Sequence, residues 1–266
     1  MLASQRQSAI LDLVRRHGGV RVSELVRQLG VSDMTIRRDL EALVDRGLVD
    51  KVHGGATMAA LGSTEELGFD AKSARQLDEK AAIAARAAEL VEPGTAIALS
   101  AGTTTAALAA YLINVPGLTV VTNSIPVADA LYRKGRIDQT VVLTGGVRTP
   151  SDALAGPVAE AAIGSLNVDV LFLGVHGMGP RTGFTTPNLM EAAIDRLMVA
   201  TARRVVVLAD HTKWETAGIA TIAPLEGADI LITDAGLPIE ARAELAGRVG
   251  ELIVADGREQ RFGGTR

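Results

Sequence analysis

The sequence of 266 residues contains no cysteine, and this absence excludes several kinds of site together. Disulfide bonds, thiolate-bound metal ions, iron–sulfur clusters and cysteine nucleophiles all need the thiol group. Aromatic side chains are also scarce, with four phenylalanines, two tyrosines and one tryptophan. Proteins that stack single-stranded nucleic acid need several aromatic rings, so the composition disfavours this class of protein.

Signals for export, membrane insertion and cofactor binding are missing as well. No apolar run follows the first methionine, which predicts a soluble, cytoplasmic protein. Residues 93–128 carry no charge, but prolines and glycines interrupt them, so a buried strand, turn and helix are favoured over a membrane span. Neither glycine-rich nucleotide motif occurs, and the four histidines lack metal-ligand spacing. We therefore expect no cofactor and no metal ion.

The charges are divided unevenly along the chain. Up to Thr57 there are nine basic and seven acidic residues, and subtraction from totals of 27 and 31 leaves 18 basic and 24 acidic residues. The formal charge is thus +2 in the first part and −6 in the rest. An acidic protein with one slightly basic end is expected to contact nucleic acid at that end alone.

Three helices and a small wing are predicted in the first 57 residues. The first helix ends at Gly18, Ser23 is the expected N-cap of the second, and Ser32 is the expected N-cap of the third. A glycine turn at Gly30 joins the second and third helices, which is the helix-turn-helix arrangement. Residues Leu48–Val52 alternate as a strand does and form the wing. The third helix is expected to bury Ile36, Leu40, Leu43 and Val44.

Helical spacing places the start of the third helix on the outside. Met34, Thr35 and Arg38 point away from the apolar positions, and Arg37 lies at their flank. Arginine chelates O6 and N7 of guanine and threonine contacts the thymine methyl group, so this face suits the major groove of DNA. The wing is expected near backbone phosphates or the minor groove. The predicted DNA-binding residues are Ser32, Met34, Thr35, Arg37, Arg38, Lys51 and His53.

An ordinary solvated helix face is the alternative interpretation of Arg37 and Arg38, because Asp39, Glu41 and Asp45 balance their charge. For two adjacent arginines alone, this alternative would be preferred. Several other features of this segment all fit a winged helix-turn-helix, and together they favour DNA binding. They are the N-caps, the turn, the inward apolar set, the basic helix start and the wing.

The rest of the chain alternates short apolar runs with helical stretches. The predicted strands are Ala96–Leu99, Leu118–Thr122, Gln139–Leu143, Asp169–Leu173, Arg204–Ala209, Asp229–Ile232 and Leu252–Val254. The predicted helices are Asp78–Val91, Thr104–Ile113, Pro126–Arg133, Val158–Leu166 and Leu189–Thr201. This alternation predicts an α/β domain with a doubly wound, mostly parallel sheet. In such sheets, ligands bind beyond the carboxyl ends of the strands.

Glycines and polar residues follow the predicted strands. The Gly/Thr turn at 102–105 opens a helix, and its backbone N–H groups and hydroxyls suit an anion. Asparagine, serine and a glycine pair suit sugar hydroxyls, while lysine and arginine could supply counter-charge. Each piece alone is also found in ordinary turns, but their convergence at one sheet edge predicts a small phosphorylated polyol as the ligand. The predicted effector-binding residues are Lys80, Gly102, Thr103, Thr104, Thr105, Asn123, Ser124, Gly145, Gly146, Arg148 and Lys213.

Two parts of the sequence resemble the DeoR family of bacterial transcriptional regulators. Residues 31–56, VSDMTIRRDLEALVDRGLVDKVHGGA, have the family's recognition helix and its basic-x-His-Gly-Gly-Ala wing. Later pieces such as 122–124, TNS, and 209–214, ADHTKW, resemble the family's sensor domain. The resemblance implies a winged helix-turn-helix followed by a domain similar in fold to ribose-5-phosphate isomerase that senses phosphorylated sugars or related catabolic intermediates. Ser100 stands where the family usually has aspartate, so the identity of the effector is not carried over.

These observations predict a winged helix-turn-helix over 1–57, a linker over 58–72, an effector-binding and oligomerisation domain over 73–257 and a tail over 258–266. The expected function is a transcriptional repressor of carbohydrate-catabolism genes. It would bind double-stranded operator DNA as a homo-oligomer, a dimer or a tetramer, and a phosphorylated sugar would relieve repression.

Two other functions are open at this stage. A sugar-phosphate isomerase needs a positioned carboxylate, and residues 174–179, GVHGMG, contain none where the related isomerases have acids, so no enzymatic activity is expected. A DNA-binding protein whose large domain only dimerises would not need polar strand ends, which counts against that alternative.

Overall fold

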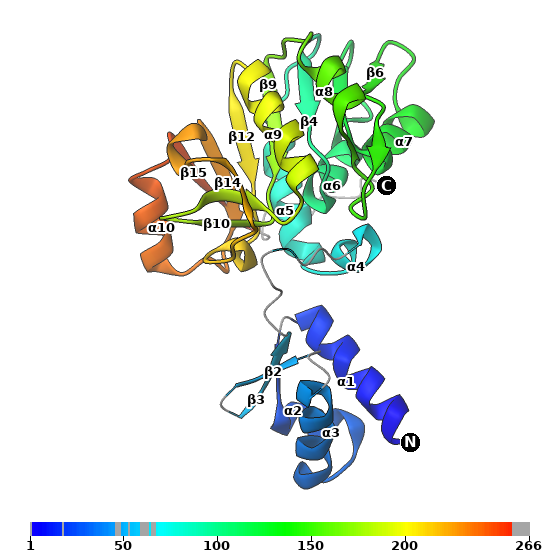
Figure 1. Ribbon diagram of the computed structural model, residues 1–266, viewed down its shortest axis with the longest axis vertical. Helices are drawn as coiled ribbons and strands as arrows, with labels where there is room; N and C mark the ends of the chain where they lie inside the picture. The colour runs from blue at the N-terminus through cyan, green and yellow to red at the C-terminus, as the bar shows by residue number, and fades with distance from the viewer. Residues whose placement is uncertain are drawn as a thin grey trace, which may run out of the picture. The chain divides into compact units, whose positions relative to one another are not determined.

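The computed structural model describes residues 2–17, 19–45, 49–52, 54–58, 64 and 68–256 (Figure 1). The chain divides into two compact units. The smaller unit runs to Met58 and includes 74–76, and the larger unit contains Phe69–Ser73 and everything described from Leu77 onward. No helix within these residues is long and apolar enough to cross a membrane.

The small unit has the predicted winged helix-turn-helix arrangement. Its elements are α1 (Ala3–His17), β1 (Gly19–Arg21), α2 (Val22–Leu29), α3 (Asp33–Asp45), β2 (Val49–Val52) and β3 (Gly55–Met58). The strands form an antiparallel sheet in the order β1–β3–β2. The core buries Ile10, Val14, Leu25, Ile36, Leu40, Leu43 and Val49. Of the four inward positions expected on the third helix, Val44 alone is half-buried.

The start of α2 corrects the expectation for Ser23. Helix α2 begins at Val22, and Arg21 occupies the N-cap position. The backbone N–H of Arg21 donates to Glu24 Oε2 at 3.3 Å, so a glutamate in the first turn closes this helix end instead of a serine hydroxyl.

The start of α3 agrees with the expectation. Ser32 Oγ accepts a hydrogen bond from the backbone N–H of Thr35 at 3.3 Å, which satisfies one of the N–H groups that a helix start leaves without a partner. His53 of the wing lies outside the described residues.

A seven-stranded parallel sheet forms the centre of the large unit, in the order β15–β14–β12–β9–β4–β5–β6. Its strands are β4 (Ala96–Leu99), β5 (Thr119–Thr122), β6 (Thr140–Leu143), β9 (Val170–Gly174), β12 (Val205–Leu208), β14 (Ile230–Asp234) and β15 (Glu251–Ala255). All seven lie close to the bounds predicted from the sequence. The α/β, doubly wound fold class is thereby confirmed.

Helices cover both faces of this sheet (Figure 1). They are α5 (Leu77–Ala88), α6 (Thr103–Leu112), α7 (Ile125–Lys134), α8 (Pro157–Ile163), α9 (Leu189–Thr201) and α10 (Ile239–Ala246). On one face Leu171 and Leu173 pack with α8, α9 and α10, and on the other Phe172 packs with α5, α6 and α7. Because successive strand residues point to opposite faces, a continuous apolar strand supplies both cores.

The chain order changes direction between β4 and β9. From β4 the chain runs through β5 to the edge strand β6, and it then returns to β9, which pairs with the other side of β4. The connections after β4 and β9 therefore leave the sheet in opposite directions. Open α/β sheets form their ligand crevice at such a point, outside the carboxyl ends of the two strands.

Several short elements are not predicted by the sequence. They are α4 (Phe69–Ser73), the hairpin of β7 (Val147–Arg148) and β8 (Leu154–Ala155), and a second antiparallel sheet of β10 (Gly177–Gly179), β11 (Gly183–Thr186) and β13 (Ala220–Ala223). Helix α4 corrects the end of the expected linker. The backbone N–H of Phe69 donates to Pro150 O at 3.1 Å, and residues 68–73 belong to the large unit.

Candidate DNA interface and sensor crevice

The outer face of α3 carries the residues predicted to contact DNA. Met34 is 63% exposed, and Arg37 and Arg38 are also exposed, while Ile36 on the opposite side is fully buried. Thr35 is half-buried, and its hydroxyl lies 2.9 Å from the hydroxyl of Ser32. Helix α3 therefore presents a polar, basic start to solvent, as the major groove of DNA requires.

Each of two cations beside this face has a carboxylate partner from α3. Arg37 Nε lies 2.5 Å from Asp33 Oδ1 and Arg37 Nη2 lies 3.3 Å from Asp33 Oδ2. The hydrogen bond with Asp33, followed by the charge of Asp33, raises the pKa of Arg37 above its ordinary value. Lys51 Nζ on β2 lies 3.5 Å from Glu41 Oε1. Both pairs are at least half exposed, so DNA can reach each cation.

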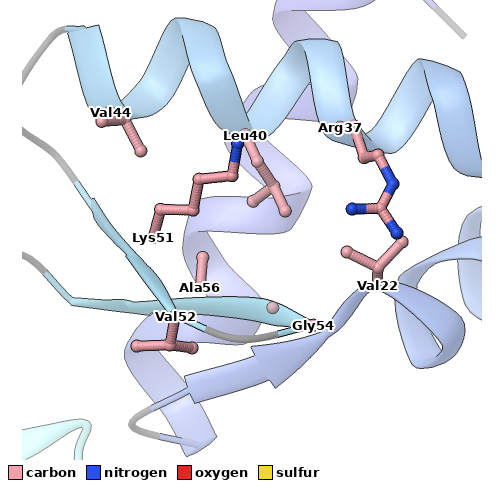
Figure 2. A pocket seen from close by; sticks show the side chains of 9 residues that line it. Val22, Arg37, Leu40, Val44, Lys51, Val52, Gly54 and Ala56 are labelled. Carbon is pink, nitrogen blue, oxygen red and sulfur yellow. The ribbon is translucent and has the colours of Figure 1, made fainter.

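A pocket of about 300 Å³ lies between α3 and the wing, with Arg37 and Lys51 among its lining residues (Figure 2). Its other lining residues are Val22, Leu40, Val44, Val52, Gly54, Gly55 and Ala56. Apolar groups with two cations match the chemistry of a sugar–phosphate backbone, in which deoxyribose is apolar and phosphate is charged.

The structural role of Asp39 is not evident from the sequence. Its side chain is 5% exposed and accepts from Arg6 Nε at 2.5 Å, from Arg6 Nη2 at 3.2 Å and from Gln7 Nε2 at 3.2 Å. Asp39 is therefore not part of the exposed charge that could balance Arg37 and Arg38. It fixes α3 to α1, and no local sequence signal reveals this because the partners lie 33 residues apart.

In the large unit, the start of α6 lies at the point where the strand order reverses. Helix α6 follows β4 directly, and its N-cap residue Gly102 makes no side-chain capping hydrogen bond. A Cβ atom on Gly102 would lie 3.8 Å from the Cα of Gly174 at the end of β9, so the two strand ends approach closely. Within the described part of the chain, the hydroxyls of Thr103 and Thr104 make no hydrogen bond. These N–H groups and hydroxyls are the anion-binding groups that the sequence predicts.

Other predicted effector residues already have structural hydrogen bonds. Thr105 is fully buried and its hydroxyl donates to Ser100 O at 2.7 Å and Gly102 O at 2.9 Å. Asn123 Oδ1 accepts from Ala101 N at 2.9 Å, and its Nδ2 donates 3.3 Å to a backbone oxygen of β8. These two side chains shape the loop before α6.

The residues after β5 and β6 have similar structural roles. The hydroxyl of Ser124 is the N-cap of α7. Gly145 and Gly146 have φ values of +72° and +119°, which side chains other than glycine rarely adopt. Arg148 Nε on β7 donates at 2.8 Å to Asp152 Oδ1, which lies between β7 and β8.

The two predicted lysines lie on different elements. Lys80 of α5 is 6% exposed, and its Nζ donates to Lys72 O at 2.6 Å. The side chain of Lys72, which the sequence does not single out, in turn donates to Ser151 Oγ at 2.6 Å. Lys213 Nζ lies 3.9 Å from Asp210 Oδ2 at the end of β12.

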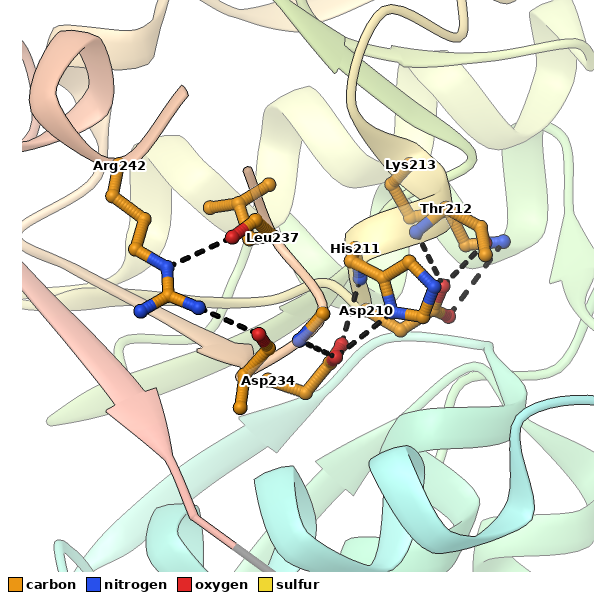
Figure 3. A network of polar contacts seen from close by, with 9 residues as sticks. Asp210, His211, Thr212, Lys213, Asp234, Leu237 and Arg242 are labelled. Carbon is orange, nitrogen blue, oxygen red and sulfur yellow. Dashed lines mark hydrogen bonds and ion pairs between the residues drawn. The ribbon is translucent and has the colours of Figure 1, made fainter. Parts of the chain in front are cut away.

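A polar network connects the ends of β12 and β14 (Figure 3). Asp210 Oδ1 accepts from Thr212 N at 3.0 Å, whereas its Oδ2 is buried without a hydrogen bond in the described part of the chain. His211 Nδ1 lies 2.8 Å from Asp234 Oδ1, and the backbone N–H of His211 donates to Asp234 Oδ2 at 2.7 Å. The hydrogen bond that Asp234 accepts raises the pKa of His211 and outweighs the opposing effect of burial. Among the described residues there is no group of three histidine or acidic side chains suited to a metal ion.

Comparison with known proteins covers both units. Residues 75–235 match the family described as the DeoR C terminal sensor domain, and residues 6–60 match the DeoR-like helix-turn-helix domain. The HTH-type transcriptional regulator GlpR of Haloferax volcanii is 39% identical over 92% of this chain and 95% of its own length. The HTH-type transcriptional repressor CsqR of Escherichia coli K12 is 30% identical over 96% of this chain and 96% of its own length.

A solved structure of ribose-5-phosphate isomerase A from Methanocaldococcus jannaschii aligns with 52% of this chain and 54% of that chain, at 18% identity and a TM-score of 0.37. The assignment to a family rests on the sequence matches, which extend over both units. The chain belongs to the DeoR family of transcriptional regulators and joins a helix-turn-helix DNA-binding domain to a C-terminal sensor domain.

Proposed function

We propose that this regulator represses carbohydrate-catabolism genes and that a phosphorylated sugar releases it from its operator. The observation that carries the proposal is the start of α6 at the strand-order reversal, where Thr103 and Thr104 offer hydroxyls and backbone N–H groups without partners in the described chain. A phosphate accepts such hydrogen bonds and gains from the positive end of the helix dipole.

Further side chains would bind the polyol part of the effector. The buried Oδ2 of Asp210 has no hydrogen-bond donor in the described chain, and a sugar hydroxyl would supply one. Lys80 and Lys213 add positive charge for the phosphate. The other predicted effector residues then act mainly by shaping the loops around the crevice. They are Thr105, Asn123, Ser124, Gly145, Gly146 and Arg148.

The proposed DNA contacts come from the first domain, over 1–57, and the effector binds the second, which extends to about residue 257. Paired copies of α3 would occupy successive major grooves, so a homo-oligomer with half-sites about one helical turn apart is the expected state. We do not expect isomerase activity, because 174–179 lack the carboxylate that proton transfer between carbons requires.

A thermal-shift screen tests the effector. The purified protein is heated with sugar phosphates, each paired with its unphosphorylated sugar. A ligand at a hundred times its Kd stabilises the protein by about 2.7 kcal/mol, which corresponds to a shift of several degrees. A hit that needs the phosphate and weakens operator binding supports the proposal, and a panel without any such hit contradicts it.

Thr104→Asp tests the place of the phosphate. The new carboxylate would repel the phosphate, so operator binding should persist while the response to the effector is lost. Thr103→Asp is a second variant, at a half-buried position that tolerates the charge better. Ala110→Asp is the matched control, because it adds the same charge at an exposed site of α6 far from its start. A normal response in both threonine variants would exclude this phosphate site.

A further inference from the structure

We propose that Asp33 positions Arg37 for bidentate recognition of a guanine in the operator half-site. This inference rests on the DNA contacts proposed above for α3. It adds that the contact made by Arg37 is with a guanine base. Asp33 lies in the first turn of α3, four residues before Arg37, so both side chains lie on the same side of the helix.

The two contacts use one particular edge of the guanidinium group. Asp33 accepts from Nε at 2.5 Å and from Nη2 at 3.3 Å. A guanidinium has five N–H donors, and this arrangement leaves the two on Nη1 and one on Nη2 pointing away from the carboxylate. Nη1 and Nη2 form the end of the fork, which is the edge that donates to O6 and N7 of guanine.

The position of this pair distinguishes it from an ordinary stabilising contact. Its side chains are 50% and 58% exposed, and exposed pairs contribute little to folding stability. A carboxylate on the DNA-facing side also repels phosphates, so Asp33 weakens binding to DNA of any sequence. Asp33 also restricts the long, flexible side chain of Arg37 to one direction. Such a fixed direction is needed to read a base, whereas a phosphate can be bound from many directions.

Neighbouring cations lack this arrangement. Arg38 is exposed and has no carboxylate partner among the residues that the structure describes. Lys51 meets Glu41 through one contact of 3.5 Å, and an ammonium group cannot chelate guanine with a planar fork. Glu41→Gln is therefore a matched control, since it removes a carboxylate from the same helix but keeps both hydrogen bonds between Arg37 and Asp33.

The test begins with DNA selected from a randomised library by the wild-type protein. The Kd is measured by fluorescence anisotropy at one salt concentration for the selected site, for each single-base variant and for unrelated DNA. For the wild type we expect one base pair per half-site at which guanine is preferred roughly 10- to 100-fold. In Asp33→Asn this preference should fall to within a few-fold, while affinity for unrelated DNA rises. Asp33→Ala gives a second variant that cannot hold Arg37 through a single oxygen.

Two further variants separate positioning from a structural role. If Asp33 acts through Arg37, Asp33→Asn should leave base preference unchanged in an Arg37→Ala background. Glu41→Gln should raise affinity for all DNA and leave the guanine preference intact. Full guanine preference in Asp33→Asn and Asp33→Ala would overturn the proposal, as would full preference in Arg37→Ala. Failure of the wild type to select any DNA would instead contradict the DNA contacts on which the inference rests.

Discussion

Two arginine–aspartate pairs on α3 share the same chemistry but differ in their surroundings. The pair of Arg6 and Asp39 is 12% and 5% exposed, and it joins α1 to α3. The pair of Arg37 and Asp33 is half exposed and lies within α3 alone. A buried charge is costly without its partner, so Arg6 and Asp39 stay together in the interior, whereas the exposed pair of Arg37 and Asp33 stays accessible to DNA.

The pair of His211 and Asp234 makes the stability of the large unit depend on pH. Asp234 raises the pKa of His211, so the stabilisation is complete below the ordinary histidine value of 6.5 and is lost as pH rises through the raised pKa. Burial disfavours the Asp234 carboxylate, but hydrogen bonds from His211 and Gly236 outweigh it and lower the pKa of Asp234. The aspartate contribution is therefore lost only in acid.

Asp234→Asn removes the negative charge while keeping the shape of the side chain. We expect it to lower Tm by a few degrees at pH 6 and by less at pH 8.5, where a smaller fraction of His211 is protonated in the wild type. Thermal unfolding followed by the fluorescence of Trp214, the single tryptophan, measures this difference. An equal loss of Tm at both pH values would show that the ion pair does not control stability.

At the scale of elements, the turn from β6 to β7 depends on two adjacent glycines in different environments. Both have positive φ. A Cβ atom on Gly146 would lie 2.6 Å from Ala155 O, which is backbone of the neighbouring strand β8. A Cβ atom on Gly145 would meet only a side-chain methyl of Val158, at 3.5 Å. The backbone of β8 cannot move away as easily as a side chain can.

Gly146→Ala should therefore destabilise the large unit more than Gly145→Ala. We expect roughly 1 kcal/mol for Gly145→Ala, from the conformational cost alone, and at least twice this loss for Gly146→Ala. Chemical denaturation followed by Trp214 fluorescence measures both free energies of unfolding. Equal losses would mean that the β7–β8 hairpin shifts to relieve the contact.

The sequence predicts the parallel sheet well because each of its strands is apolar on both faces. The run LFL at 171–173 illustrates this, since its residues divide between two cores and leave no polar position. The strands β10 and β11 consist largely of glycine and threonine, with Met178 and Phe184 as their large apolar side chains. They form no apolar run, so pattern alone cannot reveal them.

The residues of the candidate sites also fall into two groups, those whose role the sequence predicts and those whose role it does not. Exposure of Met34 and Arg38 follows from helical spacing, and Ser32 is recognisable as an N-cap. The structural use of Asn123, by contrast, depends on β8, 31 residues away. Periodicity identifies which residues a helix or strand exposes, but it does not identify their partners from distant elements.

At the scale of the whole molecule, the two units are expected to unfold separately. Trp214 packs on a core of the large unit, so its fluorescence reports that unit alone. Helix content measured by circular dichroism reports both units, because each contains helices. The two signals together therefore assign a change in stability to one unit.

Asp39→Asn should act on the small unit only. Loss of the carboxylate leaves Arg6 without its charged partner, which costs about 2 kcal/mol or more, equivalent to roughly 10 °C for a domain of this size. We expect a lower transition in the circular dichroism signal at 222 nm and an unchanged Trp214 transition. A shift in the Trp214 transition would mean that the two units unfold together.

The contact between the ends of β4 and β9 has a consequence for how the protein is made. The hydroxyl of Ser100 accepts from the backbone N–H of Gly174, which follows 74 residues later. Contacts of such long range form slowly, and β4 cannot acquire its second neighbour until the ribosome has passed β9. The apolar core and the helices and strands of the small unit lie within the first 58 residues. A nascent chain is therefore expected to complete its DNA-binding surface first and its crevice last. Each new molecule would then be able to bind DNA before it is able to bind the effector.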